Sequence, residues 1–344
     1  PLPTDVATVF SINRQRFLGA LVIAILATTT LPVCADELYR GLHKAPFSPE
    51  RVGTLKDRKL LEVSGIATSR RRPGLLWVHN DSGSKPTVYA VTETGQSRGA
   101  VTLRGATARD WEDMASFDYH GTPMLVLADV GDNNATRATL WLHFIEEPEV
   151  PEAGLPDDLT VDIAWSIPFR YPGGAADCES IAVDLASDRI LLLTKRENPP
   201  TLYALPIKPD GARPGSGKLH EATRLGEVPT IPRPLATDLL VDPVFGSWSS
   251  QPTSMDVADN ELLILTYRDV YRFVRSLEQT WAQALRATPT IVPLPKLKQS
   301  ESIAFDHSGQ DFFVTSERRN APIYRLHRVE LDTAEPEVQK SADD

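Results

Sequence analysis

The sequence predicts an all-β protein folded as a five-bladed β-propeller. A four-residue pattern recurs five times, and each copy is followed by an apolar run and then by a strand with an aromatic residue at its centre. Proline and glycine are abundant, at 28 and 20 of 344 residues, which is typical of short elements joined by turns. Four antiparallel strands repeated around an axis form a propeller.

The recurring pattern marks the first strand of each blade. It consists of a polar residue, a small or acidic residue, Ile or Met, and then Ala in four of the five copies. Successive copies begin 48, 67, 74 and 48 residues apart, which leaves room for a four-stranded blade with its loops. The five copies are Ser64–Ala67, Glu112–Ala115, Glu179–Ala182, Thr253–Asp256 and Glu301–Ala304.

Two further strands follow each copy. Short runs rich in Val, Ile, Leu and Tyr, bounded by Gly, Pro, Asn and Asp, are typical of strands. The second strands end in polar residues and lie at 75–81, 124–132, 190–197, 262–269 and 312–318. The third strands lie at 87–91, 139–144, 201–205, 270–274 and 322–326. A weaker fourth strand often comes next. In the fourth blade, a short helix is predicted at 276–287, before that fourth strand.

The last blade is predicted to be completed by the N-terminal part of the chain. The fifth unit ends near Glu330 with three strands, and residues 50–56 can supply the fourth. Such closure removes exposed sheet edges. The alternative is a six-bladed propeller with a degenerate blade in 206–252. Within that stretch, residues 229–252 connect the third and fourth blades and are long enough to cover the rim.

Residues 1–35 are predicted to be a cleaved secretory signal. Arg14 and Arg16 precede an apolar run from Phe17 to Leu31, and small residues then precede a cleavage point after Ala35. The apolar run is short for a membrane span, and no second run of about 18 residues follows it. An uncleaved anchor and a lipoprotein attached through Cys34 are the alternatives.

Residues 36–344 are therefore expected to form a single propeller domain that is periplasmic or secreted and has no membrane span. Cleavage leaves Cys178 as the one cysteine, so no internal disulfide is expected. The chain carries a net charge of −10 with a pI near 5.3. This charge argues against a nucleic-acid partner, which requires a basic face.

A ring of polar side chains is predicted at one end of the central channel. The first strands surround the axis, so their first residues converge: Ser64, Glu112, Glu179, Thr253 and Glu301. Three carboxylates in a narrow channel repel each other, which either raises their pKa values or retains a cation. Donor sets made of oxygen alone favour Ca²⁺ over Zn²⁺. The alternative is that these groups bond to backbone and water.

This ring resembles that of the calcium-activated nucleotidase (apyrase) family. A Ser, Glu, Glu, Ser/Thr, Glu succession at five strand starts is similar to the pattern of those secreted five-bladed propellers, which hold one Ca²⁺ on the axis. The similarity covers roughly residues 50–330 as a repeat pattern, and the fourth position here is Thr253. The phrases HNDSG, DWEDMA and DVGDN instead look like a group of exported bacterial propellers. The resemblance implies the fold and a Ca²⁺ site.

Charged residues from the loops after the second strands are predicted to surround the ring. An anion site is expected from basic and aromatic side chains, since Arg forks suit phosphate or carboxylate oxygens. These are Arg137, Lys195, Arg196, Tyr267, Arg268 and Arg318. Asp81, Asp113 and Asp129 are candidates to orient or deprotonate an attacking water. Asp110 and Glu317 lie on the same rim. The alternative for the basic residues is ion pairing between blades.

Three functions remain open from the sequence. The first is a Ca²⁺-dependent phosphohydrolase acting on a phosphate ester or anhydride, a small anionic substrate. The second is a non-enzymatic propeller with structural Ca²⁺ that binds a protein or glycan partner. The third is a metal-dependent lactonase-like or esterase-like hydrolase. The fold alone does not choose among them, because propellers carry many functions.

Overall fold

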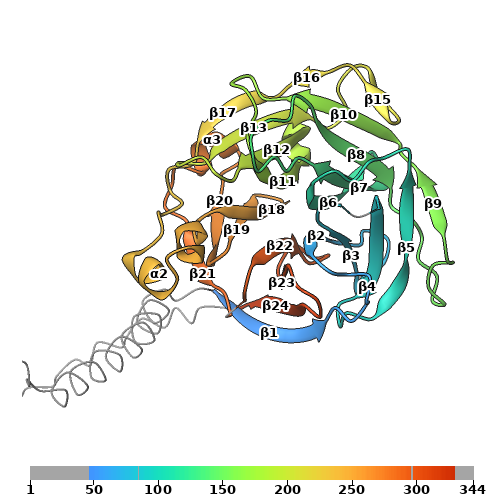
Figure 1. The fold of residues 1–344 in the computed structure, drawn as a ribbon, viewed down its shortest axis with the longest axis horizontal. Coiled ribbons are helices and arrows are strands. Elements are labelled where there is room, and N and C mark those ends of the chain that lie inside the picture. The colour runs from blue at the N-terminus through green and yellow to red at the C-terminus, as the bar shows by residue number, and fades with distance from the viewer. Residues whose placement is uncertain (1–45, 84, 296, 330–344) are drawn as a thin grey trace, which may run out of the picture.

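The protein is a five-bladed β-propeller, as the repeats predict. The computed structural model describes residues 46–83, 85–295 and 297–329, whose strands form five sheets around a common axis (Figure 1). The predicted signal at 1–35, with Cys34, lies outside these residues. In the described part of the chain no helix has the length and apolarity needed to cross a membrane.

The blades follow the chain order of the predicted repeats. Blade one is β2 (Val63–Thr68), β3 (Leu75–Asn80), β4 (Thr87–Thr92) and β5 (Ser97–Arg104). Blade two is β6 (Trp111–Tyr119), β7 (Thr122–Asp129), β8 (Leu140–Glu146) and β10 (Trp165–Arg170). Blade three is β11 (Cys178–Asp184), β12 (Arg189–Thr194), β13 (Thr201–Pro206) and β17 (Thr223–Glu227). Blade four is β18 (Pro252–Ala258), β19 (Glu261–Thr266), β20 (Asp269–Val274) and β21 (Thr290–Pro293).

Residues 206–252 do not form a sixth blade. β14 (Ala212–Arg213), β15 (Ser216–Gly217) and β16 (His220–Glu221) extend blade two beyond β10. The next strand, β17, completes blade three, and β9 (Leu159–Asp162) lies parallel to the outer edge of blade one. The predicted helix before β21 is present but short, as α3 (Trp281–Ala284).

The fifth blade closes as predicted. β22 (Ser300–Phe305), β23 (Phe312–Ser316) and β24 (Pro322–Arg328) are joined by β1 (Phe47–Thr54), which pairs antiparallel with β24 (Figure 1). Phe47 packs edgewise on Phe312 with ring centroids 4.9 Å apart. Closure therefore rests on apolar contact as well as on backbone hydrogen bonds.

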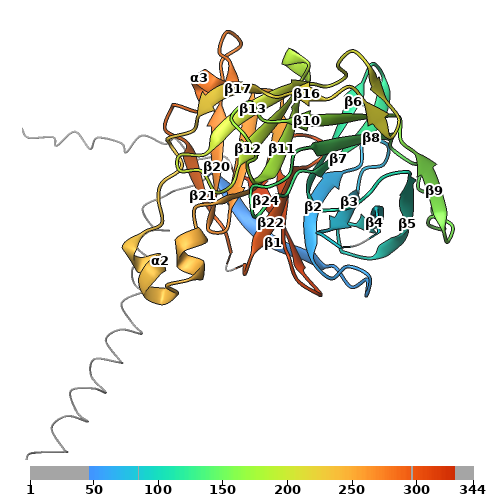
Figure 2. The ribbon, with the colours of Figure 1, turned by 45° about the horizontal axis from the view of Figure 1, so that its top comes forward.

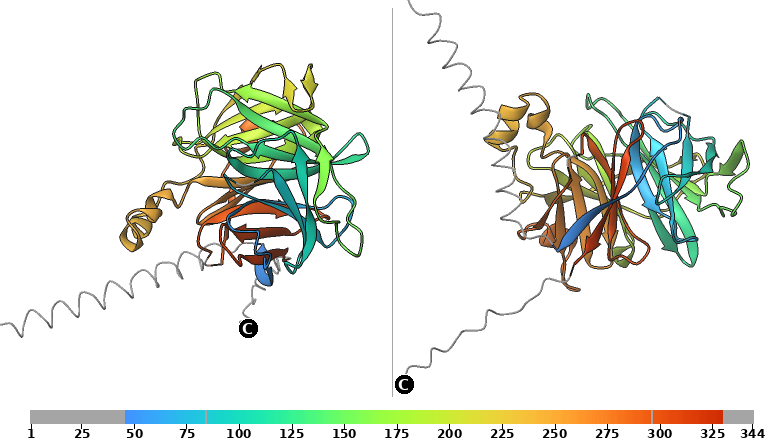
Figure 3. Two further views of the ribbon diagram at one scale, coloured as in Figure 1. Left: turned by 45° about the vertical axis from the view of Figure 1, so that its right-hand side comes forward. Right: turned by 90° about the horizontal axis from the view of Figure 1, so that it is seen from below.

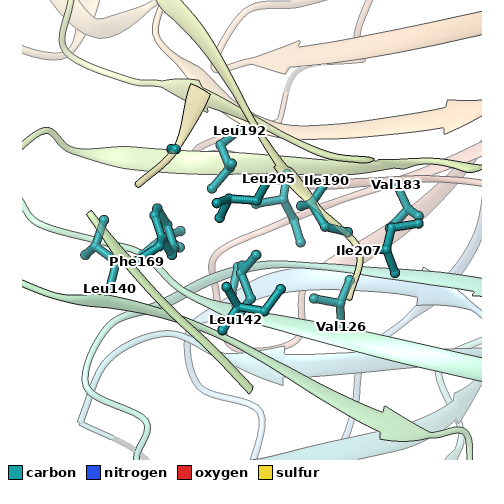
Figure 4. Close-up of a cluster of buried hydrophobic side chains, with 14 of the residues drawn as sticks. Val126, Leu140, Leu142, Phe169, Val183, Ile190, Leu192, Leu205 and Ile207 are labelled. Carbon is teal, nitrogen blue, oxygen red and sulfur yellow. The ribbon is translucent and has the colours of Figure 1, made fainter. Parts of the chain in front are cut away.

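Apolar cores lie between neighbouring blades. Figure 4 shows one of them, where Val126 and Leu142 of blade two face Ile190 and Leu205 of blade three. These side chains alternate with those of the opposite face along each strand, as a sheet covered on both faces requires. Cys178 belongs to the same core and is fully buried.

One insertion stands off the ring of blades. Between β17 and β18, the chain forms α2 (Ala236–Val241) and the 3-10 turn η2 (Phe245–Trp248). Figures 2 and 3 show this segment projecting from one face of the propeller. It is the 229–252 connection that was expected to cover the rim.

Candidate functional site

Every innermost strand carries a register shift at the residue predicted to face the channel. The shifts fall between Val63 and Gly65, Trp111 and Asp113, Cys178 and Ser180, Pro252 and Ser254, and Ser300 and Ser302. In each case the skipped residue is the ring residue: Ser64, Glu112, Glu179, Thr253 or Glu301. A bulge re-aims one side chain and interrupts alternation. All five residues are buried, and all except Thr253 line one cavity of about 220 Å³.

One side of this cavity is neutralised by a lysine. Lys195 donates to Glu179 Oε2, and also to the Tyr267 hydroxyl at 2.8 Å. Tyr267 in turn hydrogen-bonds Glu301. The Lys195 ammonium therefore offsets part of the negative charge of Glu179 and Glu301, two of the residues predicted to hold an axial cation. On the same side, the Thr253 hydroxyl donates to the Ser300 carbonyl at 2.7 Å, a bond between blades four and five.

Three carboxyl groups gather at the other side of the cavity, where Asp81 and Glu112 line it. Oxygens of Asp81, Asp110 and Glu112 all lie within 4.8 Å of one another. No arginine or lysine of the described chain forms an ion pair with any of the three. Gly131 presses against them, because a Cβ at that position would come 2.2 Å from Glu112 Oε1 and 2.6 Å from Asp110 Oδ2. The DVGDN loop therefore needs glycine here to approach the carboxyl cluster.

The raised pKa values of these groups show that ionised carboxylates are unfavourable in this site. Burial raises the pKa of Glu112 well above its usual value, and neighbouring Glu179 raises it further. Burial and nearby Asp81 raise the pKa of Asp110 to about 6. Both causes disfavour the ionised form, and a bound cation would relieve both. An acidic cluster that could hold a metal ion is therefore present, displaced from the axis toward Asp81 and Asp110.

The raised pKa values predict an unusual pH dependence of stability. Glu112, Glu179, Glu301 and Glu317 all have folded-state pKa values above that of an unfolded glutamate, chiefly through burial. The folded state then takes up protons at a pH where the unfolded state does not, so stability rises as pH falls. In chelator, the melting temperature should therefore rise as the pH is lowered from 8 to 6.5.

The matched control for this prediction is Glu301→Gln, which removes one of the four titrating groups. Its rise in melting temperature over the same range should be smaller than that of the unsubstituted protein. Equal slopes would mean that general charge repulsion, and not the cavity, causes the rise.

Asp113 follows the ring residue Glu112 in β6 and is fully buried. One oxygen accepts from the Ser254 hydroxyl and the Met114 amide, both at 2.9 Å. The other accepts from the amides of Ile181 at 2.9 Å and Met255 at 3.2 Å. Asp113 does not line the cavity, and its four bonds join blades two, three and four at the axis. The geometry gives it a structural role in place of the predicted proton transfer.

Several predicted rim residues are instead held in ion pairs. Arg137 pairs with Asp129 at 2.7 Å and donates to the Gly131 carbonyl at 2.7 Å, so both side chains support the DVGDN loop from below. Arg268 pairs with Asp238 of α2 at 2.9 Å. None of these four lines the cavity. The ion-pairing alternative therefore describes Arg137 and Arg268, because each forms an ion pair with a carboxylate and neither lines the cavity.

The remaining predicted residues do face open space. Asp81, Lys195, Arg196 and Tyr267 line the acidic cavity. Arg196 is anchored by Asp177 at 2.7 Å but its side chain stays 40% exposed. Arg318 lines an adjoining cavity of about 360 Å³, which shares Tyr267 and Trp248 with the acidic one.

Sequence reasoning placed Asp110 and Glu317 on the rim without giving them a role, and it missed Gly131. Asp110 lies two residues before Glu112, a spacing that could have suggested a shared site. Glu317 lines the acidic cavity, and its pKa is raised to about 7, mainly by burial. Gly131 could not be found from its own identity, since glycine is common in loops.

Comparisons with known proteins add little to this geometry. No protein-family model and no curated protein matches the chain. Among solved structures, a gluconolactonase from Xanthomonas campestris aligns over 80% of this chain and 88% of its own, with 15% identity and a TM-score of 0.40. A luciferin-regenerating enzyme aligns over 83% and 96%, with 10% identity and a TM-score of 0.39.

Proposed function

We propose that the protein is a divalent-cation-dependent hydrolase of neutral carboxylic esters or lactones, with Ca²⁺ as its ion. The observation that carries this proposal is the cluster of Asp81, Asp110 and Glu112 at the edge of a cavity that also holds a lysine and a tyrosine hydroxyl. The predicted signal segment supports a periplasmic or secreted location.

The donor set fits a hard cation. The three ligands are carboxylates, with no histidine or cysteine among them, which favours Ca²⁺ over Zn²⁺. Burial and neighbouring carboxylates raise the pKa values of Asp110 and Glu112 more than nearby Arg137 and Lys195 lower them. When bound, the cation would supply Lewis acidity toward a substrate oxygen. We assign Glu179 and Glu301, which were predicted as axial ligands, to hydrogen bonds with Lys195 and Tyr267 respectively.

The charge of the cavity favours a neutral substrate over a phosphate. Five carboxyl side chains line it, against two cationic ones, Lys195 and Arg196. Two of the arginines expected to hold phosphate oxygens, Arg137 and Arg268, are committed to ion pairs. The cavity therefore offers a dianionic phosphate two basic side chains, and one of them, Lys195, already bonds Glu179.

Three side chains can act on such a substrate. Lys195 and Tyr267 hold a hydrogen-bonded pair that can stabilise negative charge on a carbonyl oxygen. Glu317 lines the cavity outside the three-carboxylate cluster, and one of its oxygens accepts from Gln299 at 2.6 Å. We assign Glu317 to deprotonate the attacking water, in place of Asp113 and Asp129, which are buried. A pKa near 7 suits that role.

A phosphohydrolase is the second candidate, favoured by the partly exposed guanidinium of Arg196 at the cavity mouth. The two candidates separate in one experiment. Neutral esters, lactones and phosphate monoesters are assayed in Ca²⁺ and in chelator. Ester or lactone hydrolysis in Ca²⁺ alone supports the proposal. Hydrolysis of phosphate esters alone would replace it with the second candidate, and a protein that binds Ca²⁺ without any hydrolysis would be a binding propeller.

The assay needs a matched pair of variants. Glu317→Gln should lower kcat by about 100-fold, in the range typical of a lost general base. Glu149→Gln is the control, because that side chain is 87% exposed and does not line the cavity. Equal activity of the two variants would remove Glu317 from the mechanism.

A further inference from the structure

One wall of the adjoining cavity is formed by two exposed aromatic side chains. Phe245 and Trp248 are the two aromatic side chains that the described residues leave largely exposed, at 57% and 37%. Their rings meet edge to face, with centroids 5.2 Å apart. Large exposed apolar groups that cluster in this way mark binding surfaces. Both residues belong to η2, in the insertion that projects beside α2 in Figure 2.

This wall encloses space that continues from the acidic cavity. The adjoining cavity of about 360 Å³ is lined by Phe245, Trp248, Tyr267 and Leu297, with Gln299 and Arg318 among its polar residues. Trp248 and Tyr267 line both cavities. A molecule whose reacting group lies beside Lys195 can therefore extend past these two rings. Three aromatic walls around one space suit an aromatic ring, which packs edge to face or offset on such partners.

Contacts with the rim of blade four fix the position of the aromatic wall. Arg268 pairs with Asp238 in α2, and Asp238 also accepts from the Ser249 hydroxyl at 3.1 Å. A Cβ on Gly246 would come 2.2 Å from the Asp238 carbonyl oxygen, so η2 packs tightly on α2. These contacts tie the aromatic wall to the rim of blade four, which carries Tyr267. The insertion is thus a fixed wall of the cavity.

We propose that the substrate carries an aromatic ring and that Phe245, Trp248 and Tyr267 bind this ring. The proposal rests on the proposed ester hydrolysis for its reacting group, and it names the class as esters or lactones with an aryl substituent. Burial of a phenyl ring in such a cavity corresponds to a gain of about 10- to 100-fold in kcat/KM or affinity.

The first arm of the test measures hydrolysis. An ethyl ester of phenylacetic acid is compared with ethyl acetate, which has the same leaving group and no ring. With Ca²⁺ present, the phenyl ester should have a kcat/KM about 10- to 100-fold higher. Phe245→Ala should lower that ratio toward one. Leu240→Ala is the control, because Leu240 is 81% exposed in the same insertion but does not line the cavity, and the ratio should stay at its original value.

The second arm measures binding without hydrolysis. Phenylacetamide and acetamide are titrated calorimetrically into the full chain with Ca²⁺, and Phe245→Ala should weaken phenylacetamide binding by about 10-fold or more. Phenylacetamide binding in a protein that cleaves no ester would contradict the proposed hydrolysis and leave the aryl site standing. The aryl site would be overturned by equal affinity of the unsubstituted protein for the two amides. It would also be overturned if Phe245→Ala bound phenylacetamide as tightly as the unsubstituted protein does.

Discussion

Replacing Asp113 by alanine should destabilise the folded protein by at least about 3 kcal/mol. The substitution leaves four buried donors without their acceptor, namely the hydroxyl of Ser254 and the amides of Met114, Ile181 and Met255. Each such loss costs about 1–3 kcal/mol, because a buried donor forfeits its bond to water as well. The effect is large because three blades share one side chain. Chemical denaturation monitored by tryptophan fluorescence measures it.

Asp118→Ala is the control for this prediction. Asp118 lies on the same strand, β6, and is exposed, so its replacement should change stability by no more than about 0.5 kcal/mol. If Asp113→Ala fails to fold, Ser254→Ala is the milder variant. It removes the hydroxyl that donates to Asp113 and accepts from the Ile303 amide, and it should cost about 1–3 kcal/mol. Denaturation midpoints that coincide for all these proteins would mean that the axial bonds do not stabilise the fold.

Glu112→Gln should abolish both cation binding and hydrolysis. It removes one of three carboxylates in the cluster, and we expect a loss of at least about 100-fold in activity. At a Ca²⁺ concentration 100 times its dissociation constant, binding stabilises the folded state by about 2.7 kcal/mol, and the variant should lose that increment. In chelator, the substitution should no longer lower the stability of the folded state. The variant should be as stable as the unsubstituted protein or more so, because burial and neighbouring carboxylates disfavour the Glu112 charge.

Glu179→Gln distinguishes the off-axis cluster from an axial site. Glu179 bonds Lys195 and lies outside the three-carboxylate cluster, so this variant should keep its Ca²⁺ content in elemental analysis. Loss of Ca²⁺ from Glu112→Gln and Glu179→Gln alike would restore the axial site. Retention of Ca²⁺ by both would exclude the cluster from cation binding.

The repeats predicted the ring because its geometry follows from position in the repeat. Ser64 and Glu179 occupy equivalent places in their blades, so propeller symmetry brings them together without any knowledge of side-chain contacts. The direction in which the Asp113 side chain points could not be predicted in the same way. Alternation along an ordinary strand would turn it away from Glu112, but the bulge between Trp111 and Asp113 changes that relation.

The arginines were harder to place for a different reason. Whether Arg137 faces a ligand or a carboxylate depends on Asp129, which a turn brings back toward it at 2.7 Å. Arg268 likewise depends on Asp238, which belongs to an insertion with no counterpart in the other blades. Such pairings are not periodic, so a repeat pattern carries no information about them. The aromatic wall belongs to the same insertion.

The pairing of β1 with β24 has a consequence for how the protein is made. Phe47 and Arg328 are partners, so roughly 280 residues must be synthesised between the two halves of that blade. At about 5–20 residues per second, β1 waits roughly 15–55 s on the ribosome or beyond it for its partner. During that time it is an unpaired strand, open to association with other chains. Glu50 and Arg51, both exposed, place charge on that waiting strand and discourage such association before β24 arrives.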